Sequence, residues 1–185
     1  MTKKNILIAL LAVSFLAGGW GCTSIYPYIG YEPSEPVKVT LNEGVRDALF
    51  LNSAELEIIQ DIGKERAKVP QAAPLKISRG LSFAAKERAV KLSETERAQR
   101  RPQTAAAMME RINRFGKVQG SAAELVSYGY SARVAVHEMI RNNAMEEEPS
   151  VLYFMDPKYT VMGIGCKGDF YPICVMIFST DFSEP

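Results

Sequence analysis

The hydrophobic pattern of this chain changes from a helical period to short β-branched runs, and this change limits the fold more than any other feature. Between residues 52 and 140, four stretches repeat apolar residues at the spacing of one helix face. Two later runs, Val161 to Cys166 and Ile173 to Phe178, are rich in β-branched residues and flank a Gly-Asp turn, as the strands of a β-hairpin do. Helices first and strands last predict an α+β domain or a layered α/β/α domain.

Capping residues support the expected helices. Asn52, with Glu55 three residues later, makes a capping box for the first helix, and the second is expected over residues 81–92. Thr104 and Ser131 stand where they can cap the third and fourth helices.

The first residues have the three-part layout of a bacterial export signal. Lys3 and Lys4 precede an apolar run, residues 6–17, and the small residues that follow end at Cys22. The run is about a dozen residues long, whereas a permanent transmembrane helix needs about 20. We therefore expect residues 1–21 to be a cleaved signal peptide, and a lasting membrane helix is the alternative.

Cys22, directly after a small residue, resembles the lipidated cysteine of the bacterial lipobox. That motif has leucine three places before the cysteine and a small residue two places before it, where this chain has Gly19 and Trp20. The resemblance implies a lipidated Cys22 that attaches the protein to a membrane. Thr23 replaces the aspartate that retains lipoproteins in the inner membrane, so we expect an outer-membrane lipoprotein facing the periplasm or the cell surface. A soluble secretion signal is the alternative.

The stretch after the cysteine predicts a tether. Residues 24–39 hold three of the ten prolines, which fix φ and remove backbone donors. We expect residues 22–49 to form the lipidated N-terminus and a proline-rich tether, and residues 50–185 to form the folded domain.

The three cysteines, Cys22, Cys166 and Cys174, leave one unpaired in an exported protein unless Cys22 carries lipid. We therefore expect a disulfide between Cys166 and Cys174. A hairpin centred on Phe170 with a three-residue turn places the two cysteines opposite each other, with Cα atoms about 4.5 Å apart. A two-residue turn would pair Cys166 with Tyr171 instead, and two reduced cysteines are the alternative to the bridge.

Charge and histidine content exclude several classes of function. The 22 Lys and Arg residues oppose 21 Asp and Glu residues, and the net charge of +1 predicts no nucleic-acid partner. The single histidine, His137, leaves a zinc site of the usual composition without ligands, so we expect no metal and no cofactor. No G-x-S-x-G motif is present, and we expect His137 to be a solvated surface residue.

Several short segments form an ordered series along the chain. They are 64–67 (KERA), 74–76 (PLK) with 84–85 (AA), 123–129 (AELVSYG), 134–140 (VAVHEMI) and 155–165 (MDPKYTVMGIG). In this order they resemble the bacterial, sperm-coating-protein-like branch of the CAP superfamily, which comprises cysteine-rich secretory proteins, antigen 5 and pathogenesis-related proteins. The resemblance covers about residues 50–182. It implies a three-layer α-β-α sandwich of the CAP type.

Many CAP proteins have a cleft with two histidines and two acidic residues that can hold a divalent metal. Here Glu124 matches one acid and Asn142 stands at the other, while Ser150 and either Gln99 or Arg100 stand at the histidine positions. Because both histidines are absent, the resemblance implies no metal site and no catalytic residue. The candidate cleft residues are Glu124, Tyr128, Asn142 and Ser150.

Two of these residues have competing interpretations. Glu124 can bind a cationic or hydroxyl-bearing ligand, or it can accept hydrogen bonds from nearby backbone amides and fix the turn at Tyr128; we favour the structural role. Tyr128 and Tyr130 can line a cleft or pack on the core, and we favour the core.

Two charged clusters also have competing interpretations. The acidic run 146–148 lacks the spacing of a calcium loop, so we expect a solvated loop in preference to a calcium or partner site. Arg97, Arg100 and Arg101 are expected in a solvated loop between helices, and contact with lipopolysaccharide or lipid phosphate is the alternative.

These observations favour an exported envelope lipoprotein whose non-catalytic CAP-like domain binds a protein or cell-wall partner, with the membrane contacted through the N-terminal lipid. A module that binds a lipid or another apolar small molecule is the alternative. A metal-independent hydrolase is the third interpretation, since no histidine-assisted triad can be assembled.

Overall fold

A computed structural model describes residues 50–146, 152–169 and 171–185. The predicted signal peptide, Cys22 and the tether lie outside the described residues, as do Ser150 and Phe170. Within the described ranges, no helix has the length and apolar character needed to cross a membrane.

The two runs predicted as a hairpin form the centre of a four-stranded sheet. Its strands are β1 (Lys76–Ile77), β3 (Ala122–Tyr128), β4 (Val161–Lys167) and β5 (Ile173–Ser179). The strand order is β1-β4-β5-β3, in which only β1 runs parallel to its neighbour, and β3 lies at an edge. A separate two-stranded ribbon consists of β2 (Lys117–Val118) and β6 (Phe182–Ser183).

Helices precede and interrupt the strands. They are α2 (Ser53–Arg66), α3 (Arg79–Glu94), α4 (Ala105–Asn113) and α5 (Ala132–Ala144), with a short 3-10 helix, η1 (Arg97–Gln99), between α3 and α4. The Asn52 and Glu55 capping box is confirmed, and Thr104 accepts the backbone N–H of Ala107. Ser131 stands at the N-cap of α5, but its side chain makes no capping hydrogen bond, so the predicted side-chain cap is wrong.

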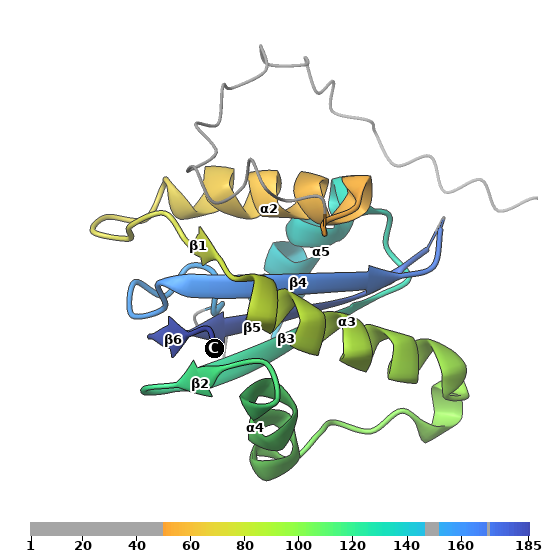
Figure 1. Cartoon of the computed structure of the whole chain (residues 1–185). Helices are drawn as coiled ribbons and strands as arrows, with labels where there is room; N and C mark the ends of the chain where they lie inside the picture. The colour runs from red at the N-terminus through yellow and green to blue at the C-terminus, as the bar shows by residue number, and fades with distance from the viewer. Residues whose placement is uncertain (1–49, 147–151, 170) are drawn as a thin grey trace, which may run out of the picture. The chain divides into compact units, whose positions relative to one another are not determined.

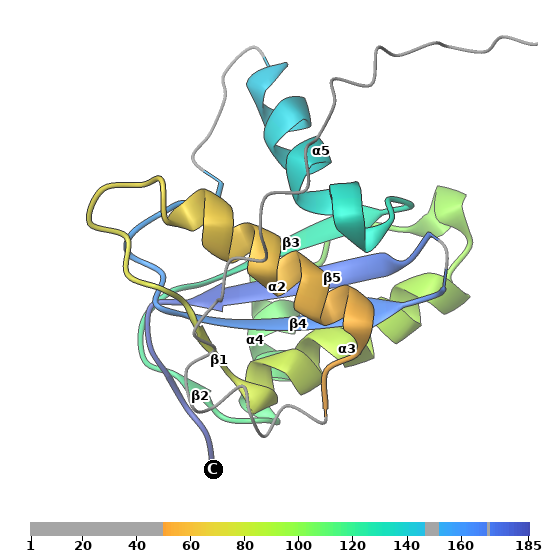
Figure 2. The same ribbon diagram turned by 90° about the horizontal axis from the view of Figure 1, so that it is seen from above.

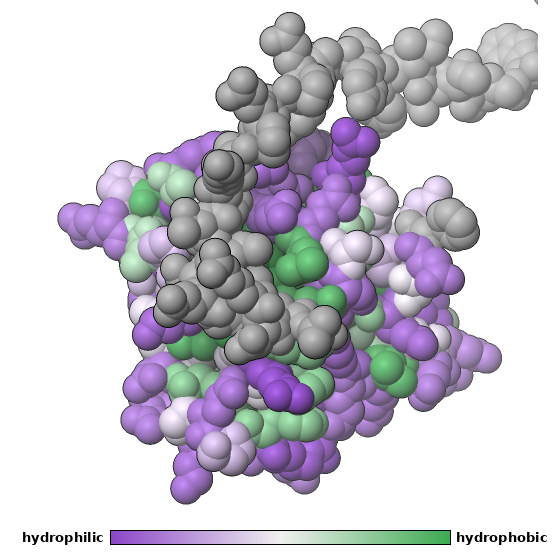
Figure 3. Space-filling view, turned by 45° about the horizontal axis from the view of Figure 1, so that its top comes forward, coloured by the Kyte–Doolittle hydropathy of each residue, from purple (hydrophilic) through white to green (hydrophobic). Residues whose placement is uncertain are grey.

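Two apolar cores fill the two sides of the sheet, with α2 and α5 on one face and α3 and α4 on the other (Figures 1 and 2). The alternation along β5 divides its side chains between them. Met176 and Phe178 pack with α2 and α5, whereas Val175 and Ile177 pack with α3 and α4. The predicted three-layer sandwich is therefore confirmed. On the face shown in Figure 3, hydrophilic residues predominate and hydrophobic ones form small patches.

Helix α3 lies directly against β4, and two glycines make this contact possible. A Cβ atom at Gly163 would lie 2.3 Å from the backbone carbon of Leu81, and one at Gly165 would lie 2.2 Å from the backbone nitrogen of Lys86. The backbone of β4 also donates from Ile164 to the hydroxyl of Ser82 on α3. The M-G-I-G segment is thus a helix-packing surface as well as a strand.

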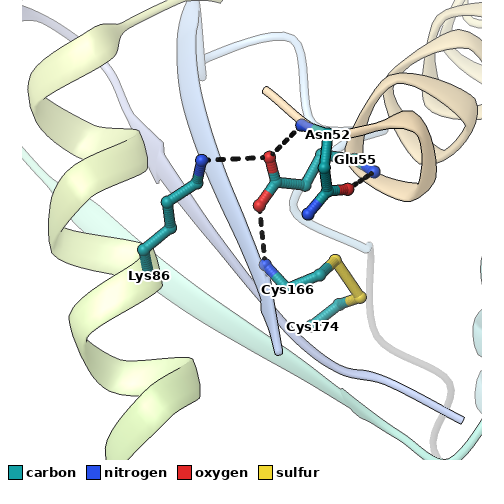
Figure 4. Close-up of a disulfide and its surroundings, with 5 residues drawn as sticks. All are labelled: Asn52, Glu55, Lys86, Cys166 and Cys174. Atoms are coloured by element: carbon teal, nitrogen blue, oxygen red, sulfur yellow. Dashed lines mark hydrogen bonds and ion pairs between the residues drawn. A yellow bond between two sulfur atoms is a disulfide. The ribbon is translucent and has the colours of Figure 1, made fainter. Parts of the chain in front are cut away.

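Cys166 and Cys174 lie opposite each other on β4 and β5 and form a disulfide, with their Cα atoms 4.1 Å apart (Figure 4). This confirms the predicted bridge and the register of the two cysteines. The predicted three-residue turn is wrong, because the last pair is Lys167 with Ile173 and five residues, 168–172, separate the strands. Pro172 has no N–H to donate, so the ladder cannot extend across it.

Candidate functional site

Glu124 lies on the edge strand β3, between helices α3 and α4. It is paired in register with Ile177 of β5, which faces the core on the same side of the sheet. Arg88 of α3 and Arg111 of α4 reach Glu124 from the two helices. The fold therefore places one carboxylate between two guanidinium groups.

Both oxygens of Glu124 face an arginine. Oε2 accepts a hydrogen bond from Nη2 of Arg111, and Oε1 lies 3.7 Å from Nε of Arg88. The side chain of Glu124 is 10% exposed and that of Arg111 is 4% exposed. In such a buried position a carboxylate needs this compensation, since an unpaired buried charge is strongly destabilising.

The two arginines are anchored on further groups. Arg111 also donates to the side-chain carbonyl of Gln103, and Arg88 donates to the backbone carbonyl of Arg101 at 3.0 Å. Burial lowers the pKa of Arg111, and the charge of Glu124 acts in the opposite direction. The Nε atoms of Arg88 and Arg111 are buried and make no hydrogen bond within the described residues.

A hollow of about 730 Å³ opens beside this cluster, along the edge strand β3, and its lining includes residues from both sides of the sheet. Its charged lining residues are Arg88, Arg97, Arg100, Arg101 and Glu124. Its aromatic lining residues are Tyr128, Tyr153 and Tyr159. We call it the arginine hollow.

A second hollow of about 520 Å³ shares Arg97, Tyr128 and Tyr153 with the arginine hollow. Asn142 of α5 is part of its lining, together with the exposed Glu146. The two hollows therefore meet beside the edge strand β3.

The structure decides between the competing interpretations of Glu124 and of Tyr128. Arginine side chains, and not the backbone amides favoured from the sequence, hold Glu124, because α3 and α4 bring Arg88 and Arg111 to it. Tyr128 is 41% exposed and lines both hollows, so the favoured core position is wrong. Its place at the end of an edge strand leaves one side of the ring uncovered.

The remaining predicted site residues do not all lie at the same hollow. Asn142 lies on the second hollow, where its amide donates to the hydroxyl of Tyr130 at 3.4 Å. Tyr130 is half-buried and packs against the core on the α2 and α5 side. His137 is exposed on α5 and lines neither hollow, and Ser150 lies outside the described residues.

The arrangement does not fit a metal ion of the kind found in many CAP clefts. Both oxygens of Glu124, the predicted cleft acid, lie at guanidinium groups, and Asn142 lies in the other hollow. No group of three or more metal-ligating side chains gathers anywhere in the ranges that the structure describes. The same arrangement does suit oxyanions, because guanidinium groups match the geometry of carboxylate and phosphate.

Sequence reasoning missed Arg88 and Arg111, although each carries a signal. Arg111 follows Met108 by three residues and precedes Ile112, so it falls on the apolar side of its helix. Arg88 directly precedes the buried Ala89 on α3. A charged residue within a predicted apolar face indicates a buried ion pair, but the pattern does not name the partner.

No known family model and no curated protein matches this sequence. Among solved structures, the chain is similar to an outer surface protein from Borrelia burgdorferi, with 20% sequence identity and a TM-score of 0.54 over 68% of this chain and 91% of that chain. It is also similar to a cysteine-rich secretory protein from Staphylococcus aureus, with 18% identity and a TM-score of 0.50 over 69% of this chain and 38% of that chain. The chain thus has the CAP fold, as the resemblance implied.

Proposed function

We propose that this chain is a non-catalytic binding protein of the bacterial cell envelope, held at the membrane by lipid on Cys22. The CAP-fold domain is the binding part, and the edge of β3 with its two hollows is the binding surface. The proposal joins an N-terminal export pattern to a cleft whose acid, Glu124, is held by two arginines.

One observation carries the non-catalytic part of the proposal, namely that Glu124 is held between Arg88 and Arg111. A general base needs a free lone pair within reach of a proton, and a metal ligand needs a free oxygen. In the arginine hollow both oxygens of Glu124 lie at guanidinium groups, which compete with a proton or a metal ion for this carboxylate. The charged lining also favours a polar ligand over the alternative of an apolar small molecule.

The envelope part of the proposal is supported by the first 22 residues and by one structural relative. The relative from Borrelia burgdorferi is described as an outer surface protein, and this chain spans 91% of its length. The apolar run of this chain is typical of an export signal, and Cys22 resembles the lipidated cysteine of the lipobox.

Site-specific crosslinking in intact cells tests the binding function. A photoreactive phenylalanine analogue would replace Tyr128, and the matched control would replace Val134, because both residues are 41% exposed but Val134 lines neither hollow. We expect a discrete adduct from position 128 and none from position 134. Equal labelling at both positions would contradict a binding surface at β3.

Hydrolysis assays test the non-catalytic part. We expect purified protein to cleave neither ester nor peptide substrates above background. Turnover that is lost in Glu124→Gln, with the thermal unfolding midpoint retained, would show that the carboxylate is catalytic and would overturn this part.

A further inference from the structure

We propose that the arginine hollow is a binding site for an organic oxyanion, a phosphate or carboxylate group attached to a sugar or an aromatic ring. This inference deepens the proposed binding function of the same surface and rests on it. It follows from the charge of the lining, from the way the arginines are held, and from the aromatic side chains beside them.

The described lining of the hollow carries an excess of positive charge. Four of its residues are arginines, and Glu124 is the one acid among the described lining residues. That acid is already shared between Arg88 and Arg111. The chain as a whole has a net charge of only +1, so the excess is local and is not a consequence of general basicity. A concave surface of one sign concentrates ligands of the opposite sign.

Backbone carbonyls, and not carboxylates, hold two of these four arginines, Arg100 and Arg101. Nε of Arg100 donates to the carbonyls of Leu92 and Thr95 at 3.0 and 3.1 Å. Arg101 donates through Nη1 to the carbonyl of Ala98 at 2.7 Å. Carbonyl acceptors fix the side chains without cancelling their charge. A binding group that is already ordered loses less conformational entropy when the ligand arrives.

Some arginine N–H groups in the arginine hollow have no hydrogen-bond acceptor among the described residues. The side chain of Arg97 is exposed and makes no hydrogen bond, ion pair or ring contact with any other described residue. The Nη atoms of Arg100 likewise have no hydrogen-bond partner in the described ranges. Such donors can satisfy a phosphate or carboxylate with two parallel hydrogen bonds.

Aromatic side chains suggest what the oxyanion is attached to. Tyr128 and Tyr153 are 41% and 38% exposed and line the hollow beside the arginines. The guanidinium of Arg100 lies 5.6 Å from the ring centroid of Tyr128, so charge and ring adjoin. A ligand with a ring next to its anionic group can contact both.

Calorimetric titration of the full-length protein in a nonionic detergent tests the proposal. The probes are glucose 6-phosphate, galacturonate and inorganic phosphate, with glucose as the uncharged control. Soluble dihexanoyl phosphatidylglycerol, compared with dihexanoyl phosphatidylcholine, distinguishes a lipid headgroup from a free sugar anion. We expect one-site binding of an anionic probe, no binding of glucose, and weaker binding as salt rises from about 0.02 M to about 0.5 M.

Two matched variants locate the site. Arg97→Gln is expected to weaken binding about tenfold, since one charged hydrogen bond is lost, whereas Arg133→Gln, at an exposed position that lines neither hollow, leaves it unchanged. Tyr153→Leu is expected to reduce the preference for glucose 6-phosphate over inorganic phosphate. Circular dichroism of each variant confirms that the fold is retained.

The calorimetric titration and the crosslinking experiment can fail independently, so the oxyanion site and the proposed binding function are tested separately. Absence of binding by every anionic probe, or equal affinity of Arg97→Gln and Arg133→Gln, overturns the oxyanion site. An adduct at position 128 would in that case leave the binding function standing with another ligand class. Anion binding without a cellular adduct, by contrast, would uphold this site and count against the envelope partner.

Discussion

The carboxylate of Glu55 accepts the backbone N–H of Cys166 at 2.9 Å, which ties the start of helix α2 to the disulfide-bonded strand β4 (Figure 4). The other oxygen of Glu55 accepts the backbone N–H of Asn52 at 2.8 Å and lies 3.2 Å from Nζ of Lys86. Glu55 is fully buried. One capping residue therefore connects α2, α3 and β4.

Glu55→Ala is expected to destabilise the protein by about 2–4 kcal/mol, because the backbone amides of Cys166 and Asn52 lose their acceptor and the ammonium of Lys86 loses its ion-pair partner. Urea unfolding measures the change. Glu57→Ala is the matched control, since Glu57 is exposed on the same helix. Equal losses from the two variants would contradict the connecting role of Glu55.

Gly165→Ala is expected to destabilise the protein by about 2–3 kcal/mol, because the added Cβ would lie 2.2 Å from the backbone of Lys86 and would push α3 away from β4. The opposite result is expected for Gly63→Ala. That glycine lies within α2 with no atom inside 4 Å of the added Cβ, so helix propensity should stabilise the variant by about 0.5–1 kcal/mol. Thermal unfolding of both variants checks the contrast in sign.

Glu184 is expected to make part of the stability dependent on pH. Burial alone would raise the pKa of Glu184, but hydrogen bonds, chiefly from the Gly80 amide and the Ser78 hydroxyl, bring the pKa below its ordinary value of 4.5. A carboxyl with a lowered pKa stabilises the fold above the unfolded pKa, and this stabilisation is lost as pH falls through the folded pKa.

The difference in unfolding free energy between wild type and Glu184→Gln should therefore be present at pH 7 and should shrink as pH falls below about 4.5. Unfolding curves at a series of pH values measure it. A difference that stays constant with pH would show that charge on Glu184 does not contribute.

Cys22→Ser is expected to move the protein from the membrane fraction to the soluble fraction of the cell, because the thiol that would carry the lipid is absent. Fractionation and the mass of the mature N-terminus check this outcome. An unchanged distribution and mass would favour a soluble secretion signal or a retained helix.

Local features were predictable from the sequence where their physical cause is local. The capping box of Asn52 and Glu55 depends on residues three apart, and the opposition of Cys166 and Cys174 depends on a short hairpin. The turn length was missed because it depended on a single residue, Pro172, that ends the hydrogen-bond ladder. The layered architecture followed from helical and strand periods that each expose one apolar side.

The long-range partners of polar groups could not be predicted in this way. Arg66 is 1% exposed, and its guanidinium donates to the carbonyls of Ala73, Phe154, Asp156 and Tyr159, most of them about 90 residues away in the chain. Glu124 was identified as a cleft residue, but its arginine partners come from two other elements. The residues next to Arg66 and Glu124 in the sequence do not identify these distant partners.

The sequence by itself thus determined the four helices, the two strands of the hairpin and which two cysteines can pair, because these depend on neighbouring residues, whereas the other strands, including β3 with Glu124, were not predicted. Only the tertiary structure decided that Arg88 and Arg111 compensate the charge of Glu124. It also decided that Arg97, Arg100 and Arg101 line one hollow together with Tyr128. The physical reason is that a charge acts through space. Its partner is whichever group the packing of α3 and α4 on the sheet brings within a few ångströms.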